Sequence, residues 1–236
     1  MSPITIPCMV LAAGRGERMR PLTDHTPKPL LEVQGKALLD WHLGNLQEYG
    51  GSNIVINHAW LGEKIVAHIA NANFPKLHIS FSKEAAALET AGGIRQALDL
   101  LNPQDYFFVI NGDIFCPEFP FGKISEIVEA LRSTKKTVLA YLFLVKNPGH
   151  NTKGDFTLEG EFVQDKKELC ENYTFSGAGI YHKDLFKGIA QGDVAKLAPL
   201  LRNAMSNNEV MGELLKADWV DVGTPERLAE LNKMSS

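Results

Sequence analysis

The residues best suited to chemistry form one glycine- and arginine-rich loop near the N-terminus. The loop follows an apolar run at residues 8–12 and reads Leu11-Ala-Ala-Gly-Arg-Gly-Glu-Arg-Met-Arg-Pro-Leu-Thr23, with Lys28 between two prolines soon after it. Glycines leave backbone N–H groups uncovered, and the clustered Arg and Lys side chains add positive charge. This combination predicts a binding site for a polyanion, and a nucleoside triphosphate is the ligand that suits it best.

Spacing excludes two other phosphate-binding loops. A Rossmann fingerprint needs a third glycine where this sequence has Met19, and the P-loop pattern G-x-x-x-x-G-K-[ST] occurs nowhere in the chain. A solvated basic loop is the plain structural alternative. The crowding of arginines between Arg15 and Lys28 favours phosphate binding instead.

Two carboxylates stand at the ends of predicted strands. Asp113 closes Asn111-Gly-Asp113 directly after an apolar run, and Asp221 lies in Trp219-Val-Asp-Val-Gly-Thr224. Carboxylate oxygens at such places suit Mg²⁺. The structural alternatives are a turn at Asp113 and a helix cap at Asp221, although Thr224 already serves as a cap.

The elements that must position these residues alternate between strands and helices. Apolar runs predict strands at residues 8–12, 53–57, 77–82, 106–110 and 137–145, and amphipathic segments predict helices at residues 37–49, 62–70, 90–101 and 123–133. Gly50-Gly51 is expected to close the first helix, and Thr90 to N-cap the third. The order predicts an α/β fold with a Rossmann-like, mostly parallel mixed sheet flanked by helices. Ligands of such sheets bind at the carboxyl ends of the strands.

After residue 145 this alternation ends. Residues 147–165 predict a loop and a short hairpin, residues 173–181 and 219–222 predict later strands, and Thr224-Pro225 begins a final helix. We found no linker, internal repeat or low-complexity segment. The sequence therefore predicts a single domain over residues 1–236.

Composition excludes several classes of protein. The net charge of −4 argues against a general binder of nucleic acid or anionic membranes. The N-terminus lacks a charged leader, and its apolar stretch is too short to span a bilayer. The cysteines, Cys8, Cys116 and Cys170, form no C-x-x-C pair and no metal spacing, which is typical of a reducing compartment. We expect a soluble cytoplasmic protein, and its oligomeric state stays open.

The motif L-A-A-G-x-G-x-R-M-x-P-L-T, with Lys28, Asp113 and the W-x-D-x-G-T segment, resembles the sugar-1-phosphate nucleotidyltransferase family over nearly the whole chain. The resemblance implies the nucleotide-diphospho-sugar transferase fold and transfer of a nucleotidyl group to a sugar 1-phosphate, with release of pyrophosphate. It implies Mg²⁺ held by Asp113 and Asp221. Arg18 is expected at the departing pyrophosphate, and Lys28 at the α-phosphate and the incoming phosphate.

The resemblance also implies a nucleotide-binding half, about residues 1–112, and a sugar-binding half, about residues 113–236. The expected nucleotide contacts are Leu11, Ala12, Ala13, Gly14, Gly16, Glu17, Arg18, Glu89 and Gly92. The expected sugar contacts are Asn111, Gly154, Ser176, Gly177 and Lys196. Glu89 departs from the family, whose usual turn at this place is L-G-T-A-G.

Two features of other family members are missing from this sequence, and each limits the activities that we expect. Most hexose-1-phosphate members have a Glu-Lys-Pro segment that contacts the sugar and its phosphate, but here the region reads Glu168-Leu-Cys-Glu-Asn-Tyr173. The chain also ends after one C-terminal helix. We therefore expect no C-terminal β-helix of the kind found in larger members, and no acetyltransferase activity.

Local segments resemble one branch of the family, the N-acetylmuramate 1-phosphate uridylyltransferases of peptidoglycan recycling. These segments are Asn57-His-Ala-Trp-Leu-Gly62, Asn147-Pro-Gly-His150, Gly154-Asp-Phe156, Thr174-Phe-Ser-Gly177 and Lys196-Leu-Ala-Pro-Leu-Leu-Arg202. The branch implies UTP and N-acetylmuramic acid α-1-phosphate as substrates. Lys196 or Arg202 is then a candidate partner for the lactyl carboxylate, with a solvated surface charge as the alternative.

Several alternatives remain open from the sequence. His58 and His150 are either ligands or ordinary polar loop residues. The substrates are alternatively mannose or glucose 1-phosphate with GTP, dTTP or UTP. A phosphocholine cytidylyltransferase would need an aromatic and acidic cage that the sequence does not reveal. A nucleotide-sugar-binding regulator without turnover would not need both candidate metal carboxylates.

Overall fold

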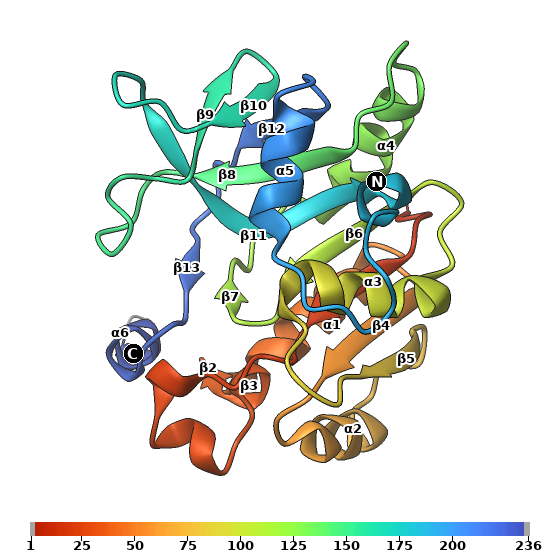
Figure 1. Cartoon of the computed structure of the whole chain (residues 1–236). Coiled ribbons are helices and arrows are strands. Elements are labelled where there is room, and N and C mark those ends of the chain that lie inside the picture. The colour runs from red at the N-terminus through yellow and green to blue at the C-terminus, as the bar shows by residue number, and fades with distance from the viewer. Residues whose placement is uncertain (1–2, 234–236) are drawn as a thin grey trace.

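A nine-stranded sheet with helices on both faces forms the centre of the computed structural model, which describes residues 3–233 (Figure 1). The strands, in spatial order, are β5 (His78–Lys83), β4 (Asn53–His58), β1 (Cys8–Leu11), β6 (Tyr106–Asn111), β11 (Asn172–His182), β8 (Ala140–Val145), β12 (Val210–Leu214), β10 (Phe162–Asp165) and β9 (Phe156–Glu159). Two further pairs are β7 (Ile114–Phe115) with β13 (Val220–Asp221), and β2 (Glu32–Val33) with β3 (Lys36–Ala37).

Strand direction places one set of carboxyl ends together. Strands β5, β4, β1 and β6 are parallel neighbours, as are β8 and β12, whereas β11 and β10 are antiparallel to their neighbours. The register sets Leu11 beside Asn57 on one side and Asn111 on the other. The mixed, Rossmann-like sheet agrees with the prediction, and its carboxyl edge gathers residues from distant parts of the chain.

The helices cover the two faces in separate layers. They are α1 (Leu38–Glu48), α2 (Gly62–Asn71), α3 (Glu89–Leu101), α4 (Ile124–Arg132), α5 (Leu197–Met205) and α6 (Pro225–Lys233). Helices α1, α2 and α4 share an apolar cluster with Cys8 and Val10 of β1, whereas α3 and α5 share another with Met9. Because both faces of β1 are buried, its residues form a continuous apolar run.

A third apolar cluster joins the two ends of the chain. It contains Met19 from the glycine- and arginine-rich loop, Phe115 of β7, Val222 directly after β13, and Leu228 of α6. Met19 and Val222 are both fully buried. The cluster therefore fixes the N-terminal loop against the segment that follows Asp221.

Turn chemistry confirms some predicted helix ends and corrects others. Gly50 has a positive φ of 79°, and Gly51 N–H donates to the Leu46 carbonyl, so this pair closes α1 as predicted. Thr224 Oγ1 accepts a hydrogen bond from Arg227 N–H ahead of α6, also as predicted. The predicted cap at Thr90 is wrong, because α3 begins at Glu89 and Thr90 lies inside its first turn.

Two strand predictions also need correction. The strand expected from residue 137 begins only at Ala140, and β12 was not predicted at all. Gly212 interrupts the apolar pattern of β12. A Cβ there would lie 2.4 Å from the Leu142 carbonyl oxygen, so close approach of the two strands requires glycine.

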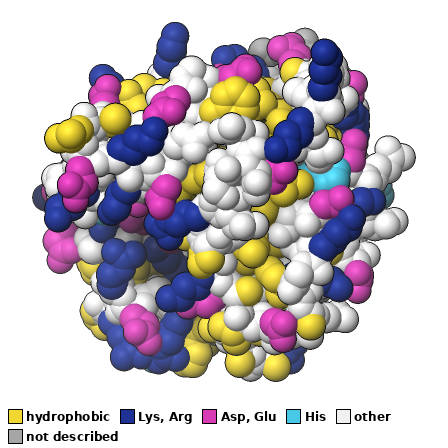
Figure 2. All heavy atoms as spheres, turned by 45° about the horizontal axis from the view of Figure 1, so that its top comes forward, with side chains coloured by type: hydrophobic (Ala, Val, Ile, Leu, Met, Phe, Trp, Pro, Cys, Tyr) yellow, Lys and Arg dark blue, Asp and Glu magenta, His cyan; other side chains and the backbone are white. Residues whose placement is uncertain are grey.

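Two further features concern the charges on the surface and the hydropathy of the helices. Basic and acidic side chains are interspersed over the face that Figure 2 presents. Among residues 3–233, no helix has the length and apolar character needed to cross a bilayer.

His42 on α1 is a buried titratable group that should make stability depend on pH. It is 4% exposed, and burial lowers its pKa to about 4 from an ordinary 6.5. Between these values the unfolded chain binds the extra proton, so stability falls as the pH drops through that window. Between pH 7 and pH 5, the protein should lose about 2 kcal/mol more unfolding free energy than a His42→Gln variant. Urea unfolding at several pH values measures this difference, and equal losses in both proteins would contradict it.

Candidate active site

A cleft of about 390 Å³ lies at the carboxyl edge of the sheet. Its lining residues are Leu11, Ala12, Ala13, Gly14, Lys28, Pro29, Asn57, Glu84, Ala87, Leu88, Glu89, Thr90, Asn111 and Asp113. The cleft thus brings together the start of the predicted phosphate loop, the predicted lysine, one predicted metal ligand and the turn before α3. Its volume is in the range of small-molecule sites.

The loop that borders this cleft has a fixed shape. Gly16 has a φ of 67°, and a Cβ there would lie 3.1 Å from the Thr23 side chain and 3.2 Å from that of Lys28. The Arg15 guanidinium stacks 3.9 Å above the Trp60 ring, and Trp60 Nε1–H donates to the Thr23 carbonyl at 3.0 Å. Glu17 and Arg18 lie on the exposed side of the short turn before buried Met19.

Lys28 and Asp113 form an ion pair at the cleft. Lys28 Nζ lies 2.5 Å from Asp113 Oδ2, and the Lys28 side chain is only 9% exposed. Pro27 and Pro29 flank the lysine in a short 3₁₀ turn. The ammonium group is therefore held at a defined point of the cleft beside the carboxylate.

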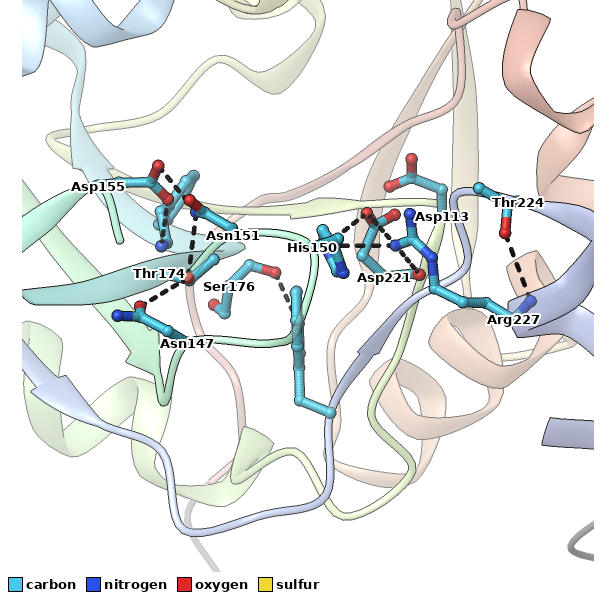
Figure 3. Close-up of polar contacts among 12 residues, drawn as sticks. Asp113, Asn147, His150, Asn151, Asp155, Thr174, Ser176, Asp221, Thr224 and Arg227 are labelled. Carbon is cyan, nitrogen blue, oxygen red and sulfur yellow. Dashed lines mark hydrogen bonds and ion pairs between the residues drawn. The ribbon is translucent and has the colours of Figure 1, made fainter. Parts of the chain in front are cut away.

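Backbone pairing brings the second carboxylate to the first. Asp221 of β13 pairs with Ile114 of β7, and Val222 N–H donates to the Asp113 carbonyl at 3.0 Å. Figure 3 shows the Asp113 and Asp221 side chains in the same region. The two predicted metal ligands, far apart in sequence, thus lie next to each other.

Asp221 has two further neighbours, Arg227, which the sequence did not assign to the site, and His150, which the sequence left open as a ligand. Its Oδ2 accepts a hydrogen bond from Arg227 Nη1 at 2.7 Å, and the same Nη1 donates to the Asp221 carbonyl at 2.7 Å. His150 Nε2 lies 3.4 Å from Asp221 Oδ2. In the sequence, Arg227 stands three residues after the helix cap Thr224, which is an ordinary place for an arginine. No feature of the sequence distinguishes it from an arginine exposed to solvent.

The donor set suits Mg²⁺ that takes further ligands from a substrate. In the described part of the chain, no group of three or more His, Cys, Asp or Glu side chains could hold a metal by itself. Mg²⁺ is usually bound by one or two carboxylates, with substrate phosphates and waters completing its shell. Asp113 and Asp221 provide such a carboxylate pair beside the cleft.

A buried polar network supports the inner end of the cleft. Asn57 Oδ1 accepts from Ala12 N–H at 2.7 Å, and Asn57 Nδ2 donates to Glu84 Oε1 at 2.7 Å. Glu84 Oε2 accepts from Leu88 N–H at 3.2 Å. Burial raises the pKa of Glu84, which is 5% exposed. The network ties the end of β1 to the turn before α3, and sequence reasoning missed it, although Glu84 follows β5 as Asp113 follows β6.

The predicted sugar-binding residues fall into two groups. Gly177 has a φ of 83°, and a Cβ there would lie 2.7 Å from Asn111 Nδ2, so these two residues meet. Ser176 is fully buried beside them, and its carbonyl accepts from Trp219 Nε1–H at 2.9 Å. Gly154, with a φ of 63°, lies in the loop that carries His150.

The remaining predicted residues lie away from this group. Gly92 is buried, and its N–H donates to the Ala195 carbonyl at 3.1 Å. Lys196 is exposed at the start of α5 and does not line the cleft. Arg202 Nε binds both Asp165 oxygens, at 3.0 and 3.1 Å. The roles of Gly92 and Lys196 in ligand binding stay predictions.

Glu89, in the cleft wall, has a strained backbone conformation. The effect of this strain on the unfolding free energy can be tested. Its φ is 60°, a region that favours glycine. Glu89→Gly should raise the unfolding free energy by about 1 kcal/mol, or roughly 2–4 °C in Tm, because the left-handed backbone costs about that much. Thr90→Gly is the matched control: Thr90 has no positive φ and should lose stability. A thermal melt in which Glu89→Gly is no more stable than the parent would contradict the strain.

Comparisons with known proteins show which family the chain is similar to. The sequence matches the protein family described as "Nucleotidyl transferase" over residues 8–235. An N-acetylmuramate alpha-1-phosphate uridylyltransferase of Neisseria meningitidis is 47% identical over 229 residues, covering 96% of this chain and 97% of that protein. A protein of the same name from Caulobacter vibrioides is 31% identical and covers 92% of each.

Solved structures show the same fold. A putative glucose-1-phosphate thymidylyltransferase from Bacillus anthracis superposes with a TM-score of 0.81 at 16% identity, covering 98% of this chain and 95% of that one. The sequence match spans nearly all of the chain, including the loop, Asp113 and Asp221. The chain belongs to the nucleotidyl transferase family.

Proposed function

We propose that the protein joins UTP and N-acetylmuramic acid α-1-phosphate to give UDP-N-acetylmuramic acid and pyrophosphate. The observation that carries the transfer chemistry is the meeting of Lys28, Asp113 and Asp221 beside one cleft. The choice of base and sugar is supported by the Neisseria relative, whose similarity extends over almost the full length of both proteins.

The reaction needs charge neutralisation more than proton transfer. An oxygen of the sugar phosphate attacks the α-phosphorus of UTP, and the bond from that phosphorus to the β-phosphate oxygen breaks, which releases pyrophosphate. A phosphate monoester has a second pKa of about 6, so it is already a nucleophile near neutral pH. No general base is needed, and the barrier is set by repulsion among phosphate oxygens.

Each part of the site has a place in this scheme. Within the described residues, Ala13 and Gly14 have backbone N–H groups that make no hydrogen bond, which suits them to phosphate oxygens. Lys28, paired with Asp113 in the cleft, is assigned to the α-phosphate and the incoming phosphate. Arg18, exposed on the loop, is assigned to the leaving pyrophosphate. Mg²⁺ at Asp113 and Asp221 would neutralise and orient the triphosphate.

A substrate screen tests the proposal. UTP, GTP, CTP and dTTP are each combined with the 1-phosphates of N-acetylmuramic acid, N-acetylglucosamine, glucose and mannose, and pyrophosphate release is measured. We expect UTP with N-acetylmuramic acid 1-phosphate to have the highest kcat/KM. One charge-assisted hydrogen bond to the lactyl carboxylate would favour it over N-acetylglucosamine 1-phosphate by roughly ten- to a hundredfold. Equal or faster turnover of glucose or mannose 1-phosphate would overturn the sugar assignment.

Removing either carboxylate should abolish most of the activity. Asp113→Ala and Asp221→Ala should each lower kcat/KM by roughly two to four orders of magnitude, since each removes a metal ligand. EDTA should have a comparable effect on the native protein, reversed by Mg²⁺. Asp184→Ala, which removes a carboxylate paired with Lys187 at 2.8 Å, is the control and should keep full activity. Near-native turnover by a folded Asp113 or Asp221 variant would show that the residue is no metal ligand.

A further inference from the structure

Arg227 is a cation built into the site that the proposed reaction leaves without a task. It lies in the first turn of α6 with its side chain only 18% exposed, and its Nη1 donates to both Oδ2 and the carbonyl of Asp221. A Cβ at Gly223 would lie 3.0 Å from Nη2, so the glycine leaves room for the guanidinium. Its position is therefore fixed by close contacts on two sides.

His150 contacts both Arg227 and Asp221 from a different part of the chain. Its Nε2 lies 3.3 Å from Arg227 Nη1 and 3.4 Å from Asp221 Oδ2. His150 belongs to the loop between β8 and β9, which reaches the site beside β11 (Figure 3). The imidazole therefore limits where the guanidinium can turn.

A hydrogen-bond network holds that loop against β11. The network therefore fixes the position of His150. Asn151 Nδ2 donates to Asp155 Oδ1 and to Thr174 Oγ1, both at 3.1 Å. Thr174 Oγ1 donates to Asn147 Oδ1 at 2.9 Å, and Asp155 Oδ2 accepts from Phe175 N–H at 2.9 Å. Figure 3 shows this network beside the Asp221 cluster.

The guanidinium has donors to spare. In the described part of the chain, only Nη1 of the Arg227 side chain makes hydrogen bonds, which leaves Nε and Nη2 for a ligand. A planar guanidinium binds a carboxylate through two parallel N–H donors. The free donors of Arg227 therefore match a carboxylate on a ligand that lies beside Asp221.

The acceptor of the proposed reaction carries two anionic groups, and the site offers two embedded cations. Lys28 is paired with Asp113 at the cleft lined by the phosphate loop, which suits the reacting phosphate. Arg227 is paired with Asp221, whose neighbour Trp219 bonds the Ser176 carbonyl of the predicted sugar-binding group. The second anion, the lactyl carboxylate, then falls to Arg227.

Resting on the proposed function, we propose that Arg227 is the residue that recognises the carboxylate of the acceptor sugar. It replaces the exposed Lys196 as the main determinant of preference for N-acetylmuramic acid 1-phosphate over N-acetylglucosamine 1-phosphate. His150 and Asp221 both contact Nη1 of the guanidinium, which leaves the edge formed by Nε and Nη2 for the carboxylate.

The test compares variants on two acceptors that differ only in the lactyl ether. Arg227→Gln should lower kcat/KM for N-acetylmuramic acid 1-phosphate roughly ten- to a hundredfold, mainly through KM, because a charge-assisted hydrogen bond is lost. Turnover of N-acetylglucosamine 1-phosphate should fall by a smaller factor, which reports the lost pairing with Asp221, so the ratio of the two kcat/KM values should drop roughly tenfold. Arg227→Lys should keep part of the preference. Lys196→Ala should keep all of it.

A matched control and a binding measurement separate recognition from damage to the site. Arg132→Gln removes an arginine that bonds both oxygens of Asp105, at 2.6 and 2.7 Å, before the amino end of β6. It should leave the preference between the acceptors unchanged. Calorimetry in EDTA should show that Arg227→Gln weakens the binding of UDP-N-acetylmuramic acid but not that of UDP-N-acetylglucosamine. This measurement depends on neither metal nor turnover.

Two results would overturn the inference and leave the proposed function standing. One is an equal loss on both acceptors, which would mean that Arg227 acts through Asp221 or the phosphate. The other is loss of the preference in Lys196→Ala but not in Arg227→Gln. Failure of the native protein to use N-acetylmuramic acid 1-phosphate at all would instead overturn the proposed function, and the inference with it.

Discussion

Charge pairing beside the cleft is the constraint on which the site depends. Two carboxylates close together repel each other and would repel a triphosphate, so each needs a cation at hand. Lys28 holds Asp113 and Arg227 holds Asp221, each at hydrogen-bond distance. Both pairs are partly buried, where charge interactions are stronger than at an open surface. The charges of these four side chains are therefore balanced in pairs without any ligand. A phosphate or metal bound as proposed would exchange partners within this set.

The fold keeps this set of charges together with backbone bonds and apolar packing. The short pairing of β7 with β13 sets the spacing of the two carboxylates, because it fixes main-chain atoms on both strands. Met19 and Val222, buried in one cluster with the first turns of α6, fix the phosphate loop to the same unit. Residues from both ends of the chain therefore pack together next to the cleft, which suits transfer chemistry that depends on positioning.

Local patterns in the sequence predicted most of the fold and the two carboxylates. Apolar runs marked β1, β4, β5 and β6. An acidic residue at the end of a predicted strand, beside a glycine, marked Asp113 and Asp221 as candidates. The Asn57–Glu84 network was missed because it depends on the register between β4 and β5. Arg227 was missed because an arginine in the first turn of a helix is ordinary until the fold brings Asp221 beneath it. What sequence reasoning lacks is the pairing of residues across strands.

Some residues around the cleft have environments or conformations that lower the stability of the fold. Glu84 is a carboxylate in a buried place, Glu89 holds a left-handed backbone, and Gly93 is so tightly packed that a Cβ would lie 2.5 Å from Glu84 Oε1. The buried carboxylate and the left-handed backbone each oppose folding locally, and all three residues lie in α3 or between β5 and α3. Such strain persists where the surrounding structure imposes it, and it concentrates at functional sites. Here the N–H groups of Ala91 and Gly92 donate to the Ala195 carbonyl, and Ala195 N–H donates to the Leu88 carbonyl. The segment before α5 therefore supports the turn in the cleft wall without lining the cleft.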